Sequence, residues 1–392
     1  MMATGVALLE AGCGPPIAAR ADPSTSATAG PITAPVRRYL PPACSNAEQL
    51  GRWSLPRLAA QLVIVPVNEG DVGVVGPEVA QGVGGLILFG SVAPAGLAVA
   101  LRELEGAAVG GVAPFVMTDE EGGGVQRMAN LVGQMPWARQ MAKTMSPAEV
   151  EALAKSVGAR LRRAGVTMDL GPVADVDGGP GPNATDADGW RSFSADPRVA
   201  ATYALAFAKG LEAAGVIPVV KHFPGLGGAT GNPDLGPAAT QPYSALKRSG
   251  LTPFRAAVAA GLPVVMVANA TVPGLTDQPA SLSAVVIEGL LRQQMGFSGL
   301  VVTDSLSAGA IQAQHLTVPQ AAVRAIAAGA DMVMFNSPDP DRLLHEIEMA
   351  LVDAVANGSV MRGTLVAAAV QVLSTKGVDL CLPPALVRGG GG

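Results

Sequence analysis

The 392-residue chain is poor in histidine, cysteine, aromatic and charged residues. It has three histidines, three cysteines and no CxxC pair, so no metal site is predicted. Charged side chains make up 15% of the chain, the net charge is -5 and no cluster of Lys and Arg stands out, which gives no support for nucleic-acid binding. The apolar runs are as short as strands and are interrupted by Gly, Pro or charge, so no membrane-spanning segment is predicted.

Apolar residues are abundant instead. Hydrophobic types form 49% of the chain, which is ample for one large core, and Gly and Ala favour close packing of helices on a sheet. Short apolar runs alternate with longer stretches of helical spacing, such as Pro147–Arg163 and Pro319–Ala328. The runs are Leu62–Val67, Gly85–Phe89, Pro114–Met117, Val166–Leu170, Ile217–Val220, Leu262–Val267, Leu300–Thr303 and Asp331–Phe335. Eight such units predict an α/β fold, a single-domain (β/α)8 TIM-type barrel, with a doubly wound parallel sheet as the alternative.

The N-terminus resembles a truncated bacterial lipoprotein signal over residues 1–13. The apolar stretch Met1–Leu9 precedes Glu10-Ala-Gly-Cys13, and a small residue before Cys is typical of the site where the Cys is acylated. Residues 14–45, rich in Pro, Ala, Ser and Thr, are predicted to form a flexible tether. The barrel domain is placed at residues 46–385 and a disordered Gly-rich tail at 386–392. The alternative is a plain disordered N-terminal segment without lipid on Cys13.

Two cysteines lie at the two ends of the predicted domain. Cys44 comes just before it and Cys381 almost closes it. A disulfide between them would join the ends of the fold and would fit an oxidising compartment. Two unrelated buried thiols are the alternative, and both interpretations stay open.

Polar motifs follow several of the predicted strands. Asp119, the pair Lys221-His222 and Asp304 each come at the end of an apolar run. In parallel barrels the carboxyl ends of the strands form the mouth of the active site, so these side chains are expected to converge there. A helix-capping role explains Asp119 or Asp304 taken singly, but not the Lys-His pair. Asp169, Asp175 and Asp177 follow the fourth strand and are assigned to loop structure.

Four motifs add specificity through their order and spacing. They are Thr118–Arg127 (TDEEGGGVQR), Arg191–Pro197 (RSFSADP), Lys221–Gly225 (KHFPG) and Gly296–Ser305 (GFSGLVVTDS). Together they resemble glycoside hydrolase family 3, specifically its single-domain β-N-acetylglucosaminidase branch, over about Leu58 to Asn336.

The resemblance implies that Asp304 is the nucleophile. Cleavage with retention needs a carboxylate that attacks the anomeric carbon and an acid that protonates the leaving oxygen. The sugar-binding residues implied are Asp119, Arg127, Arg191, Lys221 and His222. The three cationic side chains are expected to keep the neighbouring carboxylates ionised. His222 either donates to a ring hydroxyl or orients its loop.

The acid/base position departs from the family. The typical branch continues KHFPGHG and then Asp-Ser-His on a loop, where the His is the acid/base and the Asp orients it. Here Leu226 replaces the His of GHG, Asn232 stands at the orienting Asp and Asp234 at the catalytic His. Asp234 is therefore the candidate acid/base, with its pKa raised by burial under the loop or by Asp304. The alternative is a loop without an acid. Gly124 stands where the family has Arg, which predicts altered loop packing.

The sequence thus predicts a retaining exo-β-N-acetylglucosaminidase that hydrolyses terminal β-linked GlcNAc from peptidoglycan fragments through a glycosyl-Asp intermediate. It is expected to use no cofactor, to act as a monomer and to be secreted or attached to the cell envelope through Cys13. The alternatives are a β-glucosidase of the same family and a tethered sugar-binding lipoprotein with little activity.

Overall fold

The computed structural model describes residues 45–378 and residue 380. The predicted signal, the tether apart from Ser45, the tail and the cysteines at 13, 44 and 381 lie outside the described residues. The lipidation site and the disulfide therefore stay predictions.

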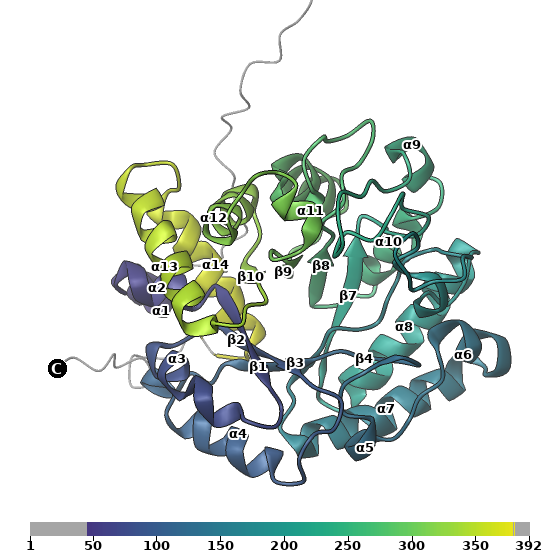
Figure 1. Cartoon of the computed structure of the whole chain (residues 1–392), viewed down its shortest axis with the longest axis horizontal. Helices are drawn as coiled ribbons and strands as arrows, with labels where there is room; N and C mark the ends of the chain where they lie inside the picture. The colour runs from purple at the N-terminus through teal and green to yellow at the C-terminus, as the bar shows by residue number, and fades with distance from the viewer. Residues whose placement is uncertain (1–44, 379, 381–392) are drawn as a thin grey trace, which may run out of the picture. The chain divides into compact units, whose positions relative to one another are not determined.

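The eight predicted apolar runs form eight parallel strands of one closed barrel, in the order β1-β10-β9-β8-β7-β6-β3-β2 (Figure 1). The strands are β1 (Val63–Asn68), β2 (Gly85–Phe89), β3 (Phe115–Thr118), β6 (Met168–Asp169), β7 (Ile217–Phe223), β8 (Val264–Val267), β9 (Leu300–Ser305) and β10 (Met332–Met334). The predicted (β/α)8 fold is confirmed. The doubly wound sheet is wrong because β1 and β2, the two ends of this strand order, also pair with each other and close the sheet.

Helices surround the barrel. The α-helices are α1 (Ser45–Leu50), α2 (Leu55–Ala60), α3 (Gly76–Gln81), α4 (Leu97–Gly106), α5 (Ala129–Val132), α6 (Ala138–Thr144), α7 (Pro147–Ala164), α8 (Pro197–Ala213), α9 (Tyr243–Leu246), α10 (Leu251–Ala259), α11 (Gly309–Gln312), α12 (Val318–Ala328), α13 (Pro340–Ala356) and α14 (Arg362–Thr375). Shorter or differently wound segments are η1 (Val72–Val75), η2 (Val109–Gly111), η3 (Gly189–Arg191), η4 (Ala280–Leu282) and the π-helix η5 (Val285–Gln294). Within the described part of the chain, no helix has the length and apolar character needed to cross a membrane.

Local sequence signals set the ends of the two predicted helices. Ser146 and Glu149 form a capping box at the start of α7, in which each side chain accepts a hydrogen bond from the other residue's backbone N–H. Thr317 and Gln320 do the same for α12. α7 ends at Gly165, whose φ of 96° lies in the left-handed region that glycine adopts without strain.

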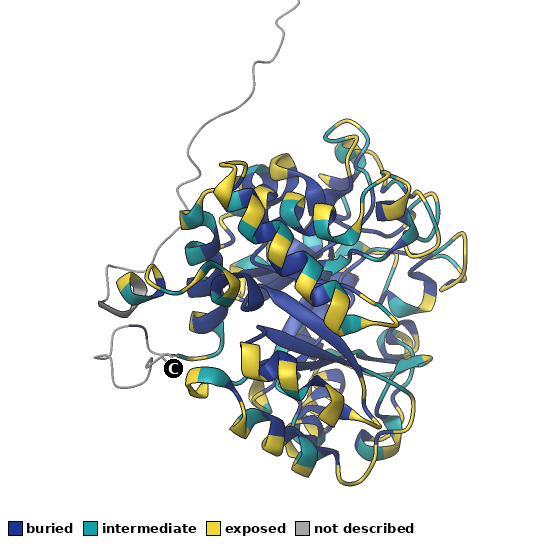
Figure 2. Cartoon of the chain, turned by 60° about the vertical axis from the view of Figure 1, so that its left-hand side comes forward, coloured by how far each residue is buried: buried dark blue, intermediate teal, exposed yellow. Residues whose placement is uncertain are grey.

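Small residues let the outer helices approach one another closely. A Cβ added to Gly210 on α8 would lie 2.3 Å from the carbonyl oxygen of Glu151 on α7. Strand side chains are buried on both faces, as in all four residues of β8, whereas helices expose their outer faces (Figure 2). This explains why the strands are continuous apolar runs and the helices amphipathic.

One small element was not predicted. Glu120–Gly122 (β4) and Val125–Gln126 (β5) form an antiparallel hairpin after β3, outside the barrel. Its sequence is charged and Gly-rich rather than apolar, so it carries no strand pattern of the kind used for the barrel. The hairpin brings residues 119–127 over the carboxyl end of β3.

Candidate active site

A cavity of about 450 Å³ lies at the carboxyl ends of the barrel strands. All seven residues predicted to act in catalysis or sugar binding line it: Asp119, Arg127, Arg191, Lys221, His222, Asp234 and Asp304. They come from segments up to 185 positions apart, since Asp119 follows β3, Lys221 and His222 end β7, and Asp304 ends β9. The expected convergence at one mouth is therefore confirmed.

Glu121 is the centre of an ionic network in this cavity, and the sequence analysis did not single it out. Its carboxylate accepts two hydrogen bonds from Arg191, at 2.8 Å from Nε and 2.8 Å from Nη2. Lys221 Nζ lies 2.6 Å from Glu121 Oε1 and 2.8 Å from Asp119 Oδ1. Arg127 Nη2 lies 3.8 Å from Asp119 Oδ2. Two buried cations are thus neutralised by two carboxylates before any sugar binds.

The network fixes the protonation states of its members. Burial alone would raise the pKa of Glu121, but Arg191 and Lys221 hold it well below its usual value. Asp119 and Glu121 keep the pKa of Lys221 above its usual value despite burial. Adjacent Glu120 points the other way, because neighbouring strand residues face opposite sides, and its carboxylate accepts hydrogen bonds from Gln126 and from the Met128 backbone. This alternation of side-chain direction is the sequence signal that could have placed Glu121 in the cavity.

His222 is held between Asp175 and Arg191. Its Nδ1 lies 2.6 Å from Asp175 Oδ2, and its Nε2 lies 3.3 Å from Arg191 Nη2. Burial and Arg191 lower the pKa of His222 to about 4, so the ring is neutral at pH 7. Since the arginine can only donate, Nε2 accepts and Nδ1 carries the proton. In this geometry His222 has no proton on Nε2 to donate to a sugar hydroxyl, contrary to one of the two predicted roles.

Asp175 does more than shape its loop. Besides the His222 ring, its Oδ2 accepts from the His222 backbone N at 3.0 Å, and its Oδ1 accepts from the Leu226 backbone N at 2.6 Å. Burial raises the pKa of Asp175 to about 7. The residue therefore ties the loop after β6 to the end of β7, and the assignment to loop structure is incomplete.

The segment that carries Arg191 is fixed from outside by Arg139 of α6. This guanidinium donates to the carbonyl oxygens of Asp177 at 2.8 Å, of Gly179 at 2.6 Å and of Gly189. Charge-assisted hydrogen bonds of this kind are stronger than neutral ones. The long loop between β6 and α8 is thereby held in one conformation.

Asp304 and Asp234 both line the cavity, one at the end of β9 and the other in the loop after β7. Asp304 Oδ1 accepts a hydrogen bond from the Ser305 backbone N at 2.7 Å. Burial and the charge of Asp234 raise the pKa of Asp304, while the Ser305 N–H and Lys221 lower it by less. Lys221 and Arg191 do not offset this rise, because they are already paired with other carboxylates. That the cationic side chains keep Asp304 ionised stays a prediction.

Asp234 is exposed rather than buried under its loop. Its backbone is nonetheless anchored, since Gly309 N donates to Asp234 O at 3.0 Å and Ala310 N donates to Pro233 O at 2.9 Å. Asn232 accepts a hydrogen bond from the Asp234 backbone N through Oδ1, at 3.0 Å. Asn232 thus organises the turn through the backbone of Asp234.

Leu226 and Gly124, the two other positions that depart from the family pattern, are explained by packing. Leu226 is buried with Ala187, Ala238, Ala268 and Ala270 in a small apolar cluster. At Gly124, an added Cβ would lie 2.9 Å from the ring of Trp137. The indole lies against the hairpin at the place where a larger side chain would stand. The predicted change in loop packing relative to the family stays a prediction.

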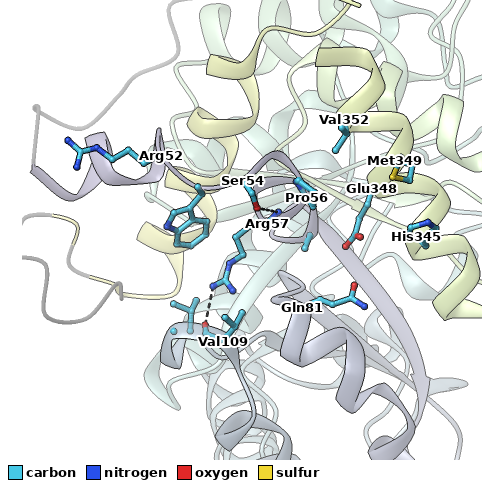
Figure 3. Close-up of a pocket in the computed structure, with 14 residues that line it drawn as sticks. Arg52, Ser54, Pro56, Arg57, Gln81, Val109, His345, Glu348, Met349 and Val352 are labelled. Carbon is cyan, nitrogen blue, oxygen red and sulfur yellow. Dashed lines mark hydrogen bonds between the residues drawn. The ribbon is translucent and has the colours of Figure 1, made fainter. Parts of the chain in front are cut away.

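A second, larger cavity of about 660 Å³ lies away from these residues. Figure 3 shows its wall, in which Arg57 is 4.5 Å from the ring centre of Trp53 and donates to Val109 O at 3.0 Å. Its lining includes Ala60, Gln81 and Val112, which precede β1, β2 and β3, so it opens at the amino ends of the strands. Glu348 is its one lining carboxylate among the described residues, so the cavity lacks a carboxylate pair.

Comparison with known proteins agrees with this geometry. Residues 61–375 match the model of the glycosyl hydrolase family 3 N terminal domain. Beta-hexosaminidase LpqI of Mycobacterium tuberculosis is 36% identical over 339 residues, covering 84% of this chain and 85% of LpqI. A crystal structure of a GH3 family glycosyl hydrolase from Mycobacterium smegmatis is 37% identical, with a TM-score of 0.75, covering 83% of this chain and 98% of that one.

A third similar protein is a named N-acetylhexosaminidase. The crystal structure of beta-N-acetylhexosaminidase from Beutenbergia cavernae has a TM-score of 0.75 and 33% identity, and covers 83% of this chain and 99% of that one. The barrel, the converging motifs and these similarities lead to one conclusion: the chain is a member of glycoside hydrolase family 3.

Proposed function

We propose that this protein is a retaining, exo-acting β-N-acetylglucosaminidase that hydrolyses terminal β-linked GlcNAc. The observation that carries the proposal is that Asp304 and Asp234 line one sugar-sized cavity with a pre-formed network of cations and carboxylates. A pair of carboxyl groups is what retaining glycoside hydrolysis requires. The similarity to proteins named beta-hexosaminidase supports the N-acetylhexosamine substrate.

In this mechanism Asp304 attacks the anomeric carbon and the glycosidic oxygen leaves, forming a covalent glycosyl-Asp304 ester. The Ser305 N–H holds one carboxylate oxygen and leaves the other for attack. The side chain ends a barrel strand, so its position is fixed by the strands on either side. Water then attacks the same carbon, releasing Asp304 and giving the β-anomer of the free sugar.

Asp234 protonates the leaving oxygen in the first step and removes a proton from water in the second. The charge of Asp234 contributes to the raised pKa of Asp304, so the two carboxyl groups interact across the cavity. The anchored backbone of Asp234 gives its side chain a defined starting point on the cavity wall.

The ionic network supplies the hydrogen bonds that hold the ring. The second oxygen of Asp119 and the guanidinium of Arg127 lie 3.8 Å apart, beyond hydrogen-bond distance, so each has capacity left for a sugar hydroxyl. Lys221 and Glu121 are almost fully buried and serve to fix Asp119 and Arg191.

The proposal predicts which substrates turn over and what is released. The protein should hydrolyse 4-nitrophenyl β-N-acetylglucosaminide far faster than the matching β-glucoside. In phosphate buffer it should release free GlcNAc, because the Asp234 carboxylate repels a phosphate acceptor while Asp304 is bound as the uncharged ester. Chromatography of the reaction mixture separates free GlcNAc from GlcNAc 1-phosphate and measures both. Faster glucoside turnover would favour the β-glucosidase. Binding of GlcNAc without turnover would favour the sugar-binding alternative. The absence of the Asp-His dyad is the observation behind that alternative.

We further propose that the substrates are peptidoglycan fragments outside the cytoplasm and that Cys13 is lipidated. The residues before Cys13 support this, since a small residue precedes it as in bacterial lipoproteins. When the full chain is expressed in a bacterial host with labelled palmitate, the label should enter the protein, and Cys13→Ser should abolish it. Equal labelling of both proteins would contradict the proposal.

A further inference from the structure

Next to the sugar site lies a second group of side chains with unsatisfied bonding capacity. Asp175, Asp188 and His222 are 0%, 1% and 4% exposed. One ligand atom from each lies within 4.8 Å of the other two. Asp175 and His222 already contact each other, and Asp188 Oδ1 lies 3.9 Å from His222 Nδ1.

Asp188 is the unusual member of this group. Neither of its carboxylate oxygens receives a hydrogen bond from a described residue. The nearest cation is Arg191, 3.9 Å away, and that guanidinium is already bidentate to Glu121. Burial raises the pKa of Asp188 well above its usual value, and the protonated side chain donates a hydrogen bond to Asp175. A metal ion would take the place of that proton.

The surroundings of the two aspartates leave room for a cation. In the cavity, Arg191 and Lys221 are paired with Glu121 and Asp119. Of the described Lys and Arg side chains, only Arg191 lies within 4 Å of Asp188 in an ion pair, and none does so for Asp175. Burial raises the pKa of Asp175 to about 7 and that of Asp188 well above its usual value, so the pair retains protons that a divalent cation would displace.

We propose that Asp175, Asp188 and His222 form a binding site for a divalent transition-metal ion such as Zn²⁺ or Mn²⁺. Two carboxylates and one imidazole are a donor set that such ions accept. Ligands of tetrahedral zinc stand roughly 3.3 Å apart, given bonds of about 2.0–2.1 Å. The separations of 2.6 and 3.9 Å from His222 Nδ1 lie on either side of that value, so small side-chain shifts close the site.

The other contacts of these ligands suit a metal site. Asp175 Oδ1 accepts from the Leu226 N–H, and Oδ2, which also accepts from the His222 backbone N–H, is the oxygen beside His222 Nδ1. Backbone hydrogen bonds that orient ligating carboxylates are a regular feature of metal sites. The three positions are separated by 13 and 34 residues and match no metal motif, which is why the sequence predicted none.

Binding would change the role of His222 in the sugar site, an effect that depends on the proposed function. The ion replaces the proton on Nδ1, and Nε2 takes up a proton to keep the ring neutral. Nε2 then can no longer accept from Arg191, 3.3 Å away, and becomes a donor toward the cavity. Metal occupancy would thus decide whether His222 binds Arg191 or a substrate oxygen.

The test is a titration of the full chain, stripped of metal by a chelator, with Zn²⁺ and Mn²⁺ followed by calorimetry. We expect one site per chain, weakened about 100-fold or more by Asp188→Asn. Asp169→Asn is the matched control, because Asp169 is equally buried and also has an unpartnered oxygen but lies outside the group. It should bind the ion as the unaltered protein does. Thermal melts of both variants confirm folding.

Nitrogen-15 histidine spectra provide a second readout. With three histidines in the chain, the His222 signals are assigned by Asp188→Asn, and Zn²⁺ should shift Nδ1 rather than Nε2. Absence of binding, or binding that Asp188→Asn leaves unchanged, would overturn the metal site. Turnover of 4-nitrophenyl β-N-acetylglucosaminide by the metal-free protein tests the glycosidase independently.

Discussion

Asp304→Asn is expected to lower kcat on a β-N-acetylglucosaminide by roughly 10⁴-fold, with little change in KM. The amide cannot form the glycosyl ester, yet its oxygen can still accept from the Ser305 N–H as the carboxylate does at 2.7 Å. The geometry of the cavity is thereby kept, and the sugar-binding residues are untouched. Steady-state kinetics of the purified variant and the unaltered protein measure the effect. Thermal melts with equal Tm confirm that the variant is folded.

A fluorinated substrate provides the direct measurement. A 2-deoxy-2-fluoro glycosyl fluoride should label the unaltered protein at the peptide that contains Asp304, because the fluorine at C2 slows both formation and hydrolysis of the ester, while the good leaving group keeps formation the faster step. Asp353→Asn, on the exposed side of α13, is the control and should label and turn over normally. Label on another carboxylate, or a variant at position 304 with normal kcat, would refute the assignment.

The barrel was predictable because its strands are buried on both faces. Such strands must be apolar without interruption, as Val264–Val267 is, and eight of them between helical segments leave few alternatives. The hairpin β4–β5 escaped this reasoning because its stability comes from specific contacts. The Glu120 carboxylate binds Gln126, and Trp137 covers the glycines at 123 and 124. The apolar periodicity of a sequence does not reveal such contacts.

The placement of the seven predicted site residues followed from motif order, but the electrostatics did not. Glu121 lay inside a quoted motif, yet its role depends on Arg191 and Lys221, which are 70 and 100 positions away. Asp188 lies in no motif, and only folding brings it to His222. Because Arg191 and Lys221 bind Glu121 and Asp119, their charges do not dominate at Asp304, and this pairing could not be foreseen from the sequence.

Asp234→Ala tests whether an aspartate replaces the usual histidine acid/base. We expect kcat/KM on a disaccharide with a poor leaving group to fall by about 10²–10⁴-fold, the usual contribution of a positioned proton donor. The loss should be smaller with a 4-nitrophenyl glycoside, because that leaving group departs without a proton. Azide should restore part of the turnover and yield the β-glycosyl azide, since it needs no general base. Asp277→Ala, an exposed loop aspartate, should show none of these effects.

The pH profile of the rescued variant adds a prediction with a definite sign. The charge of Asp234 contributes to the raised pKa of Asp304, so removing it should lower that pKa. Asp304 must be ionised to attack, and the acid limb of kcat/KM should therefore move to lower pH in Asp234→Ala with azide. Rate measurements across the acid limb, beside Asp277→Ala, give the shift. An acid limb that stays in place, together with equal losses on both leaving groups, would mean that Asp234 neither faces Asp304 nor protonates the substrate.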